Sequence, residues 1–137
     1  MSSQIDGNYR TFLVSTGYTG GLAGATTGGI TAYLAVVIQS DGTITPANAA
    51  NLNYGVGVLQ EDVPAGYYGR VKLWGGAGTY MAAISGTAIT PGTAYSIITG
   101  GYVGTATAGS YTASLLALQS SANVTNGAIV EFANINA

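Results

Sequence analysis

The sequence predicts an all-β protein, folded as a compact β-barrel or sandwich from two diverged β units. Short stretches rich in Val, Ile, Thr and Tyr alternate with Gly, Asn, Asp and Pro, which is typical of strands joined by tight turns. A segment of the first half also reappears, changed, in the second half. With 137 residues, the chain is about one domain long and can bury a core without disulfides or metals.

The order of these stretches predicts eight strands. They are expected at Tyr9–Val14, Thr31–Ile38, Tyr54–Gln60, Tyr67–Trp74, Thr79–Ile84, Thr93–Ile98, Tyr111–Gln119 and Gly127–Ile135. Three dipeptides mark tight turns, because Gly and Asn accept the positive φ that such turns need: Asp41-Gly42, Gly100-Gly101 and Asn126-Gly127. The leucines of Ala113–Gln119 suit a helix or a strand by period alone.

The internal repeat favours a strand for that ambiguous stretch. Moving Ile30–Leu73 forward by 59 residues places it on Ile89–Phe132 without a gap. The turn glycines and most apolar positions then coincide, Leu59 with Leu118 among them, and the counterpart of the ambiguous stretch alternates with glycine as a strand does. Each unit has about 45 residues, too few for an independent domain. We therefore expect one domain over residues 30–137, in which residues 74–87 connect the units.

The segment ahead of the repeat differs in composition. Within Met1–Gly29, the stretch Gly17–Gly29 holds six glycines among thirteen residues and has no apolar periodicity. Such a stretch is flexible in isolation. Residues 1–29 are therefore expected to form an N-terminal arm or linker that orders only against a partner.

Composition excludes several classes of function. The chain has no Cys and no His, so thiol nucleophiles, thiolate metal sites and the commonest general base are absent. Only 6% of residues are charged and the net charge is −2, which does not suit nucleic acid or an anionic membrane. No apolar run approaches the roughly 18 residues of a spanning helix, and the N-terminus lacks the features of a signal peptide. We predict a non-enzyme with no cofactor and no metal, used without export.

Two motifs could suggest a catalytic or ligand-binding site, but the residues around them argue against it. Glu61-Asp62 is the only adjacent acidic pair, but neighbours on a strand point to opposite faces, so a solvated loop after a strand is expected. No calcium-loop pattern accompanies the pair. The glycine-rich stretch is not a phosphate loop, because neither the Lys-Ser/Thr pair nor a helix start follows it.

One strand combines cations with aromatic side chains. Tyr68, Arg70, Lys72 and Trp74 alternate, so they share one face. Arg, Tyr and Trp are enriched in interface hot spots, which favours a protein-contact surface. The equal alternative is an ordinary solvent face with Val71 inside. Two cations are too few to track a nucleic-acid backbone.

The order of several motifs resembles the capsid-stabilising, decoration-type (cement) proteins of bacteriophages, of the DUF2190 kind. The motifs are the initial Ile30-Thr31, the strand and turn of Gly57–Asp62 and Pro64–Gly66, the run Gly69–Gly75, and the later step Ala88–Gly92. The resemblance covers residues 30–135. The long glycine-rich segment and the very low charge depart from it.

This resemblance implies a β-barrel on the outside of the virion capsid. Such proteins bind the expanded lattice, often as homotrimers, and stabilise it by bridging subunits of the major capsid protein. Because the arm differs in composition and the repeat starts only at Ile30, we expect the arm to hold the capsid through Tyr9, Arg10 and Phe12. The protein would be made in the host cytoplasm without a signal peptide and bind neither nucleic acid nor membrane.

A second function remains open from the residues. Ten Tyr against two Phe suggest many half-exposed aromatic positions. Exposed tyrosines and Trp74 suit stacking on sugar rings. The alternative is therefore a carbohydrate- or host-surface-binding module, such as a head-fibre or adhesin domain.

Overall fold

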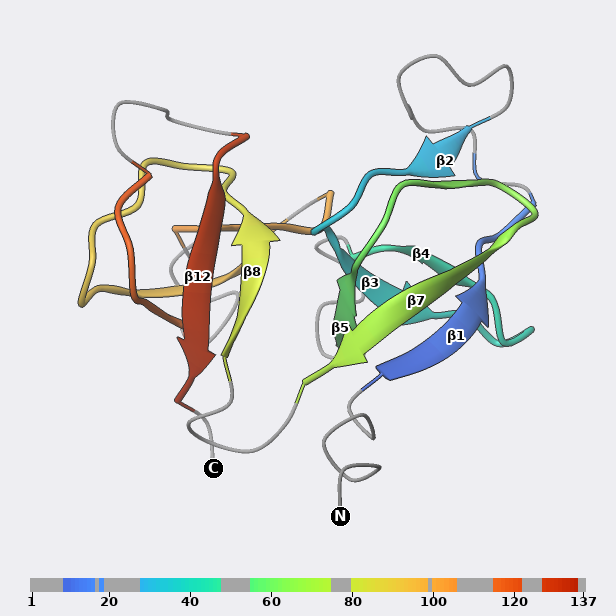
Figure 1. Cartoon of the computed structure of the whole chain (residues 1–137), viewed down its shortest axis with the longest axis horizontal. Coiled ribbons are helices and arrows are strands. Elements are labelled where there is room, and N and C mark those ends of the chain that lie inside the picture. The colour runs from blue at the N-terminus through green and yellow to red at the C-terminus, as the bar shows by residue number, and fades with distance from the viewer. Residues whose placement is uncertain are drawn as a thin grey trace.

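The protein is all-β, and its two main sheets pack together as a sandwich rather than a single closed barrel (Figure 1). The computed structural model describes residues 9–16, 18, 28–47, 55–74, 80–98, 100–105, 115–121 and 127–135. These residues form twelve strands and no helix. The predicted fold class is confirmed.

The first main sheet has five strands in the order β1-β7-β5-β3-β4. Their bounds are β1 Tyr9–Leu13, β3 Ala35–Ile38, β4 Ile44–Pro46, β5 Gly55–Leu59 and β7 Tyr68–Leu73. The second sheet has the order β10-β9-β11-β12-β8. Its strands are β8 Tyr80–Ile84, β9 Ala94–Ile98, β10 Tyr102–Gly104, β11 Leu115–Ala117 and β12 Ile129–Asn134. A small third sheet pairs β2 (Gly29–Ile30) with β6 (Val63–Pro64), and all strand pairs are antiparallel.

Each of the eight predicted strands contains a strand of the structure. The four that the sequence did not predict are β2, β4, β6 and β10, with only two or three residues each. A segment that short displays no period-2 pattern. Strand β11 also has three residues, but the internal repeat predicts it. The strand expected from Thr31 begins only at Ala35, because Tyr33 has a φ of 69°, in the left-handed region. Positive φ at Gly42, Gly100, Gly101 and Gly127 confirms the predicted turns.

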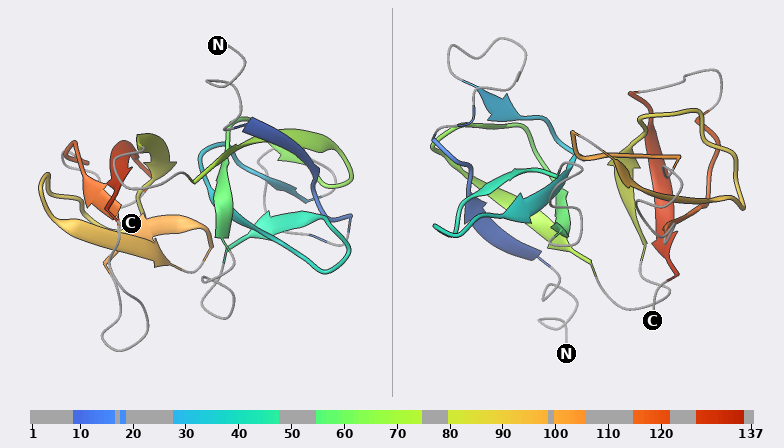
Figure 2. Two further views of the ribbon diagram at one scale, coloured as in Figure 1. Left: turned by 90° about the horizontal axis from the view of Figure 1, so that it is seen from below. Right: turned by 180° about the vertical axis from the view of Figure 1, so that it is seen from behind.

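The two main sheets have the same strand order. Read from one edge to the other, β1, β7, β5, β3 and β4 correspond to β8, β12, β11, β9 and β10. In both sheets, the chain leaving the first edge strand forms one isolated parallel bridge to the opposite edge strand, between Val14 and Ile44 and between Ser85 and Val103. Each sheet is therefore curled, and the two curled sheets lie side by side (Figure 2).

The ungapped alignment of the two halves is wrong at β11. Leu59 is fully buried, whereas Leu118 is 44% exposed and Ala117 takes the inward place. The pairings of β5 with β3 and of β11 with β9 give the same alignment. A slip of one residue turns every side chain of a strand to the other face. Leu59 therefore corresponds to Ala117, one residue earlier than the sequence match.

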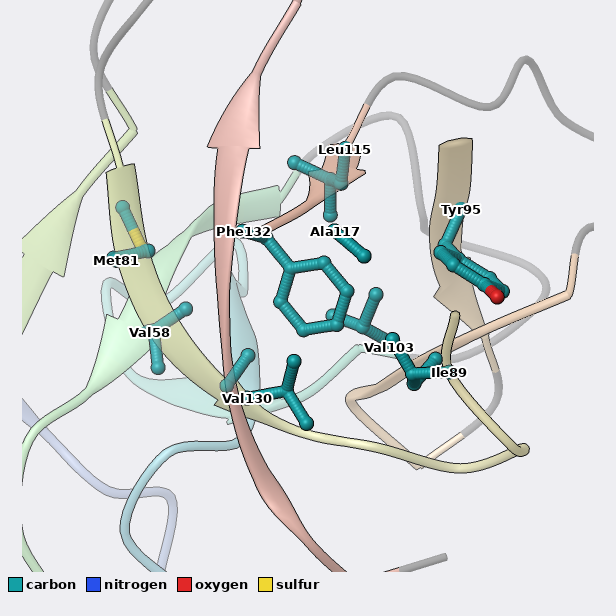
Figure 3. Close-up of a cluster of buried hydrophobic side chains, with 10 residues drawn as sticks. Val58, Met81, Ile89, Tyr95, Val103, Leu115, Ala117, Val130 and Phe132 are labelled. Carbon is teal, nitrogen blue, oxygen red and sulfur yellow. The ribbon is translucent and has the colours of Figure 1, made fainter. Parts of the chain in front are cut away.

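Each curled sheet encloses its own cluster of buried side chains. The first cluster consists of Val14, Ile30, Leu34, Val36, Ile44, Leu59, Val63 and Val71. The second surrounds Phe132, which meets Tyr95 edge to face at a centroid distance of 6.3 Å (Figure 3). Strand β5 contributes to both, because Leu59 points into the first cluster and its neighbour Val58 into the second. The core therefore runs from one sheet into the other.

Backbone contacts also join the sheets. Ala35 N donates to Gly101 O over 2.7 Å, and Ile84 N donates to Tyr33 O over 2.9 Å. Ile97 of β9 packs on the buried side chains of β3. Strand β3 is thus covered on both faces, which explains its continuous apolar run, since strands buried on both faces lose the alternating pattern.

The expectation of a separate arm before Ile30 is wrong for the part that the structure describes. Strand β1 pairs along its whole length with β7. Val14, just after it, is fully buried, and Phe12 packs against the same cluster. The composition of the glycine-rich stretch predicts a linker and so places the start of the domain at Ile30, although the strand before the stretch belongs to the first sheet. Most of that stretch, and residues 1–8, lie outside the described residues.

Candidate functional site

The pairing of β1 with β7 brings together residues that the sequence placed in two separate sites. Tyr9 lies opposite Lys72, and Leu13 lies opposite Tyr68. Arg70 lies between the two β7 residues and shares their face, because alternate residues of a strand point to the same side. The aromatic residue expected on the arm and the cations expected on the domain therefore form one surface.

The aromatic rings of this surface hold its cations in place. The guanidinium carbon of Arg70 lies 5.0 Å from the centre of the Tyr9 ring. The Lys72 Nζ lies 6.0 Å from the same centre and 5.6 Å from that of Tyr80, and it donates a hydrogen bond to the Tyr80 carbonyl oxygen over 3.2 Å. Each such cation–π contact at an exposed site contributes about 0.5–1 kcal/mol. The two cations are therefore oriented before any partner arrives.

We call this set the cation–aromatic surface: Tyr9, Tyr68, Arg70, Lys72 and Tyr80. It is open to solvent, since Tyr68 is 69% exposed and Tyr80 is 58% exposed. Strands β1 and β7 lie side by side in the first sheet, whereas β8 lies beside β12 in the second sheet (Figure 1). Tyr80 was not singled out from the sequence. Its place at the start of a predicted strand gave no sign that it would meet Lys72 across the sheets.

Three predicted contact residues do not join this surface. Arg10 lies opposite Val71, on the other face of the strand pair, and is exposed. Phe12 packs against the first core cluster, and Trp74 is partly buried against the second. The Trp74 Nε1 is buried and has no hydrogen-bond partner among the residues that the structure describes. Phe12 and Trp74 thus have packing roles.

A second exposed feature, which the sequence did not indicate, lies on the outer face of the second sheet. Leu118, Ile129 and Ile135 are 44%, 58% and 48% exposed, around the partly buried Glu131. The sequence could have indicated this exposed patch, because the run from Ile129 to Ile135 has apolar residues on both alternating faces. Only one of those faces contributes to the core.

Three of the described acidic residues, Asp41, Glu61 and Asp62, lie in turns. Asp62 Oδ1 accepts a hydrogen bond from Ala32 N over 2.7 Å, and Glu61 is exposed in the turn after β5, as expected. Hydrogen bonds from the Thr43 side chain and backbone hold the pKa of Asp41 below its ordinary value. Burial, and to a lesser degree Tyr102, raises the pKa of Tyr18.

Within the described residues, no group of three or more carboxylates is placed to hold a metal ion. The same residues contain no helix that is long and apolar enough to span a membrane. The chemistry that this part of the chain offers is that of surface contact: aromatic faces, two fixed cations and tyrosine hydroxyls.

Fold and surface together define a class, namely a two-sheet β protein with an open cation–aromatic contact face. A solved structure of the same fold is the head fiber gp8.5 N base of bacteriophage phi29, with a TM-score of 0.63 over 92% of each chain. The two sequences are 18% identical, so the likeness is one of fold. No protein-family model matches the chain, and neither does any curated protein. The specific resemblance to the DUF2190 family thus has no support from these comparisons.

Proposed function

We propose that the chain is a structural protein of a bacteriophage virion, attached to the outside of the capsid. The observation behind this proposal is the likeness to the head fiber base of phi29, which extends over 92% of both chains and so over both sheets. A likeness confined to one sheet would say less, since small β-sheets recur among unrelated proteins. In this proposal, the protein has no catalytic activity and acts by binding.

In this proposal, the protein binds the expanded capsid and bridges subunits of the major capsid protein. A protein that binds the mature lattice but not separated subunits stabilises that lattice by mass action. Many modest contacts, repeated over the shell, add up to a large collective effect. Attachment as a homotrimer is part of the same proposal and gives three such contacts per attached unit.

The test is reconstitution on capsids of the phage that encodes the chain. Purified protein is mixed with expanded capsids that lack it and, as a control, with unexpanded procapsids. We expect cosedimentation with expanded capsids only, and a higher temperature for DNA release from filled particles. Absence of binding to both particles would refute the proposal.

The other candidate is a host-surface module that binds carbohydrate. It draws on three exposed tyrosines, Tyr67, Tyr68 and Tyr80, whose faces suit stacking on sugar rings. Trp74 no longer supports this candidate, because it is partly buried against the core. Binding of the isolated protein to a glycan panel, with no binding to capsids, would favour this candidate over the first.

A further inference from the structure

We propose that the cation–aromatic surface is the face that meets the capsid, and that it docks onto an acidic patch of the major capsid protein. This rests on the proposed attachment to a capsid and adds to it the face used and the chemistry of the partner. The argument has three steps: where the charges lie, what leaves them available, and which groups fit them.

The first step is the distribution of charge along the fold. The chain has three cationic side chains, and all of them lie on β1 and β7: Arg10, Arg70 and Lys72. Two of the three face the cation–aromatic surface. The described carboxylates are on other elements: Asp41 and Glu61-Asp62 in turns, and Glu131 on β12. In a chain that is 6% charged, the cations are thus gathered on one strand pair, while the described carboxylates lie on other elements.

The second step is that these charges are not neutralised within the described part of the chain. Their partners there are neutral: the rings of Tyr9 and Tyr80 and the Tyr80 carbonyl oxygen. A cation that is held by rings keeps its charge and much of its donor capacity for a partner. Because the side chains are already oriented, docking costs less conformational entropy than with free Arg and Lys.

The third step concerns the groups that fit. Alternate residues of a strand are roughly 7 Å apart, so Arg70 and Lys72 present two positive groups at that spacing. Carboxylates on alternate residues of an extended acidic segment have the same spacing. The planar Arg70 guanidinium can bind one of them through two parallel hydrogen bonds. Tyr68 adds an amphipathic ring beside them, of the kind enriched in protein hot spots.

The test compares two substitutions with the same chemistry on opposite faces of one strand pair. Arg70→Gln removes a cation from the surface, and Arg10→Gln removes one from the other face. Both residues are exposed, so thermal melts should show that both variants fold. We expect Arg70→Gln to weaken binding to expanded capsids at least tenfold and to reduce its dependence on salt, because the partner is charged. Arg10→Gln should bind within about twofold of the unmodified protein, because the proposed contact face excludes Arg10 and replaces the expectation that this residue holds the capsid.

A second arm identifies the partner chemistry. Capsid carboxylates are converted to neutral amides with a carbodiimide and an amine before the binding assay, and we expect binding of the unmodified chain to be lost. Equal binding of Arg70→Gln and Arg10→Gln, or full binding to amidated capsids, would overturn the inference while the capsid proposal stands. Arg70-dependent self-association, or Arg70-dependent binding to hyaluronate as an acidic polysaccharide probe in place of capsids, would overturn it too. If the unmodified chain does not bind untreated capsids, both the proposed function and this inference are wrong.

Discussion

At the scale of single residues, two glycines show how the same local need is met in different surroundings. Gly42 and Gly101 hold matching places in the β3–β4 and β9–β10 hairpins, with φ of 86° and 85°. A side chain on Gly42 would meet nothing within 4 Å, whereas one on Gly101 would overlap the carbonyl oxygen of Ala35 in the other sheet. A substitution at Gly42 therefore tests backbone strain alone, whereas one at Gly101 also tests the close approach of the two sheets.

Alanine at the two positions should have different costs. Gly42→Ala places an L residue in the left-handed region and should lower the free energy of unfolding by about 1–2 kcal/mol. Gly101→Ala adds a backbone clash between the sheets and should cost at least twice as much. Urea denaturation of both variants provides the measurement. Equal losses would mean that the approach of Gly101 to β3 contributes nothing.

Asp41 gives a pH dependence whose sign follows from its lowered pKa. The folded state favours the charged carboxylate, so its contribution is fully present above pH about 4 and is lost as pH falls through the lowered pKa. Asp41→Asn should therefore destabilise the protein at pH 6, and the gap to the unmodified protein should narrow towards pH 2. Thr43→Val, which removes the side-chain donor but keeps the backbone N–H, should show a smaller effect. A gap that does not change with pH would contradict this.

At the scale of elements, the sequence predicts most of the secondary structure but not the positions that depend on pairing between strands. Alternation, the turn glycines and, for β11, the internal repeat locate eight of the twelve described strands. The face that β11 presents depends on its register with β9, which an ungapped alignment cannot reveal. In the same way, the contact surface appears in the sequence as two halves, and only the pairing of β1 with β7 unites Tyr9 with Arg70.

Strand β1 belongs to the first sheet rather than to a separate arm, and a substitution of Val14, directly after the strand, tests this. Val14 is fully buried in the first core cluster, so Val14→Ala should reduce the free energy of unfolding by about 2 kcal/mol. Thr11→Ala, at an exposed position of the same segment, should change it by less than about 0.5 kcal/mol. Thermal melts of the two variants compare them. If Val14→Ala leaves the free energy of unfolding unchanged, this segment would be a separate arm after all.

At the scale of the whole molecule, shared side chains make the two sheets one cooperative unit. Val58 belongs to the first sheet by its strand and to the second by its contacts. The hydrogen bonds from Ala35 to Gly101 and from Ile84 to Tyr33 cross the same boundary. Neither sheet keeps its full core when the other unfolds, so the repeat in the sequence does not give two folding units.

We therefore expect one unfolding transition. Trp74 fluorescence, which reports on the second cluster, should coincide with far-UV circular dichroism of the whole chain. Val58→Ala should shift both curves together, to a stability lower by about 2 kcal/mol. Hydrogen exchange at Val36 and Val130, one in each sheet, should slow or quicken in parallel. Two separate transitions would show that the sheets unfold independently.

The isolated bridges from Val14 to Ile44 and from Ser85 to Val103 bear on the proposed attachment of many copies to one capsid. An open sheet edge invites pairing with another chain, and most proteins discourage this with charged side chains along the edge. A chain with so few charges has little of that protection. Each sheet curls until its two edges meet at one bridge, and two of the four edge strands, β4 and β10, have only three residues each, which shortens the ladder that a neighbour could extend. If many copies attach to a capsid as proposed, we expect this closure to hinder their fusion into a continuous sheet.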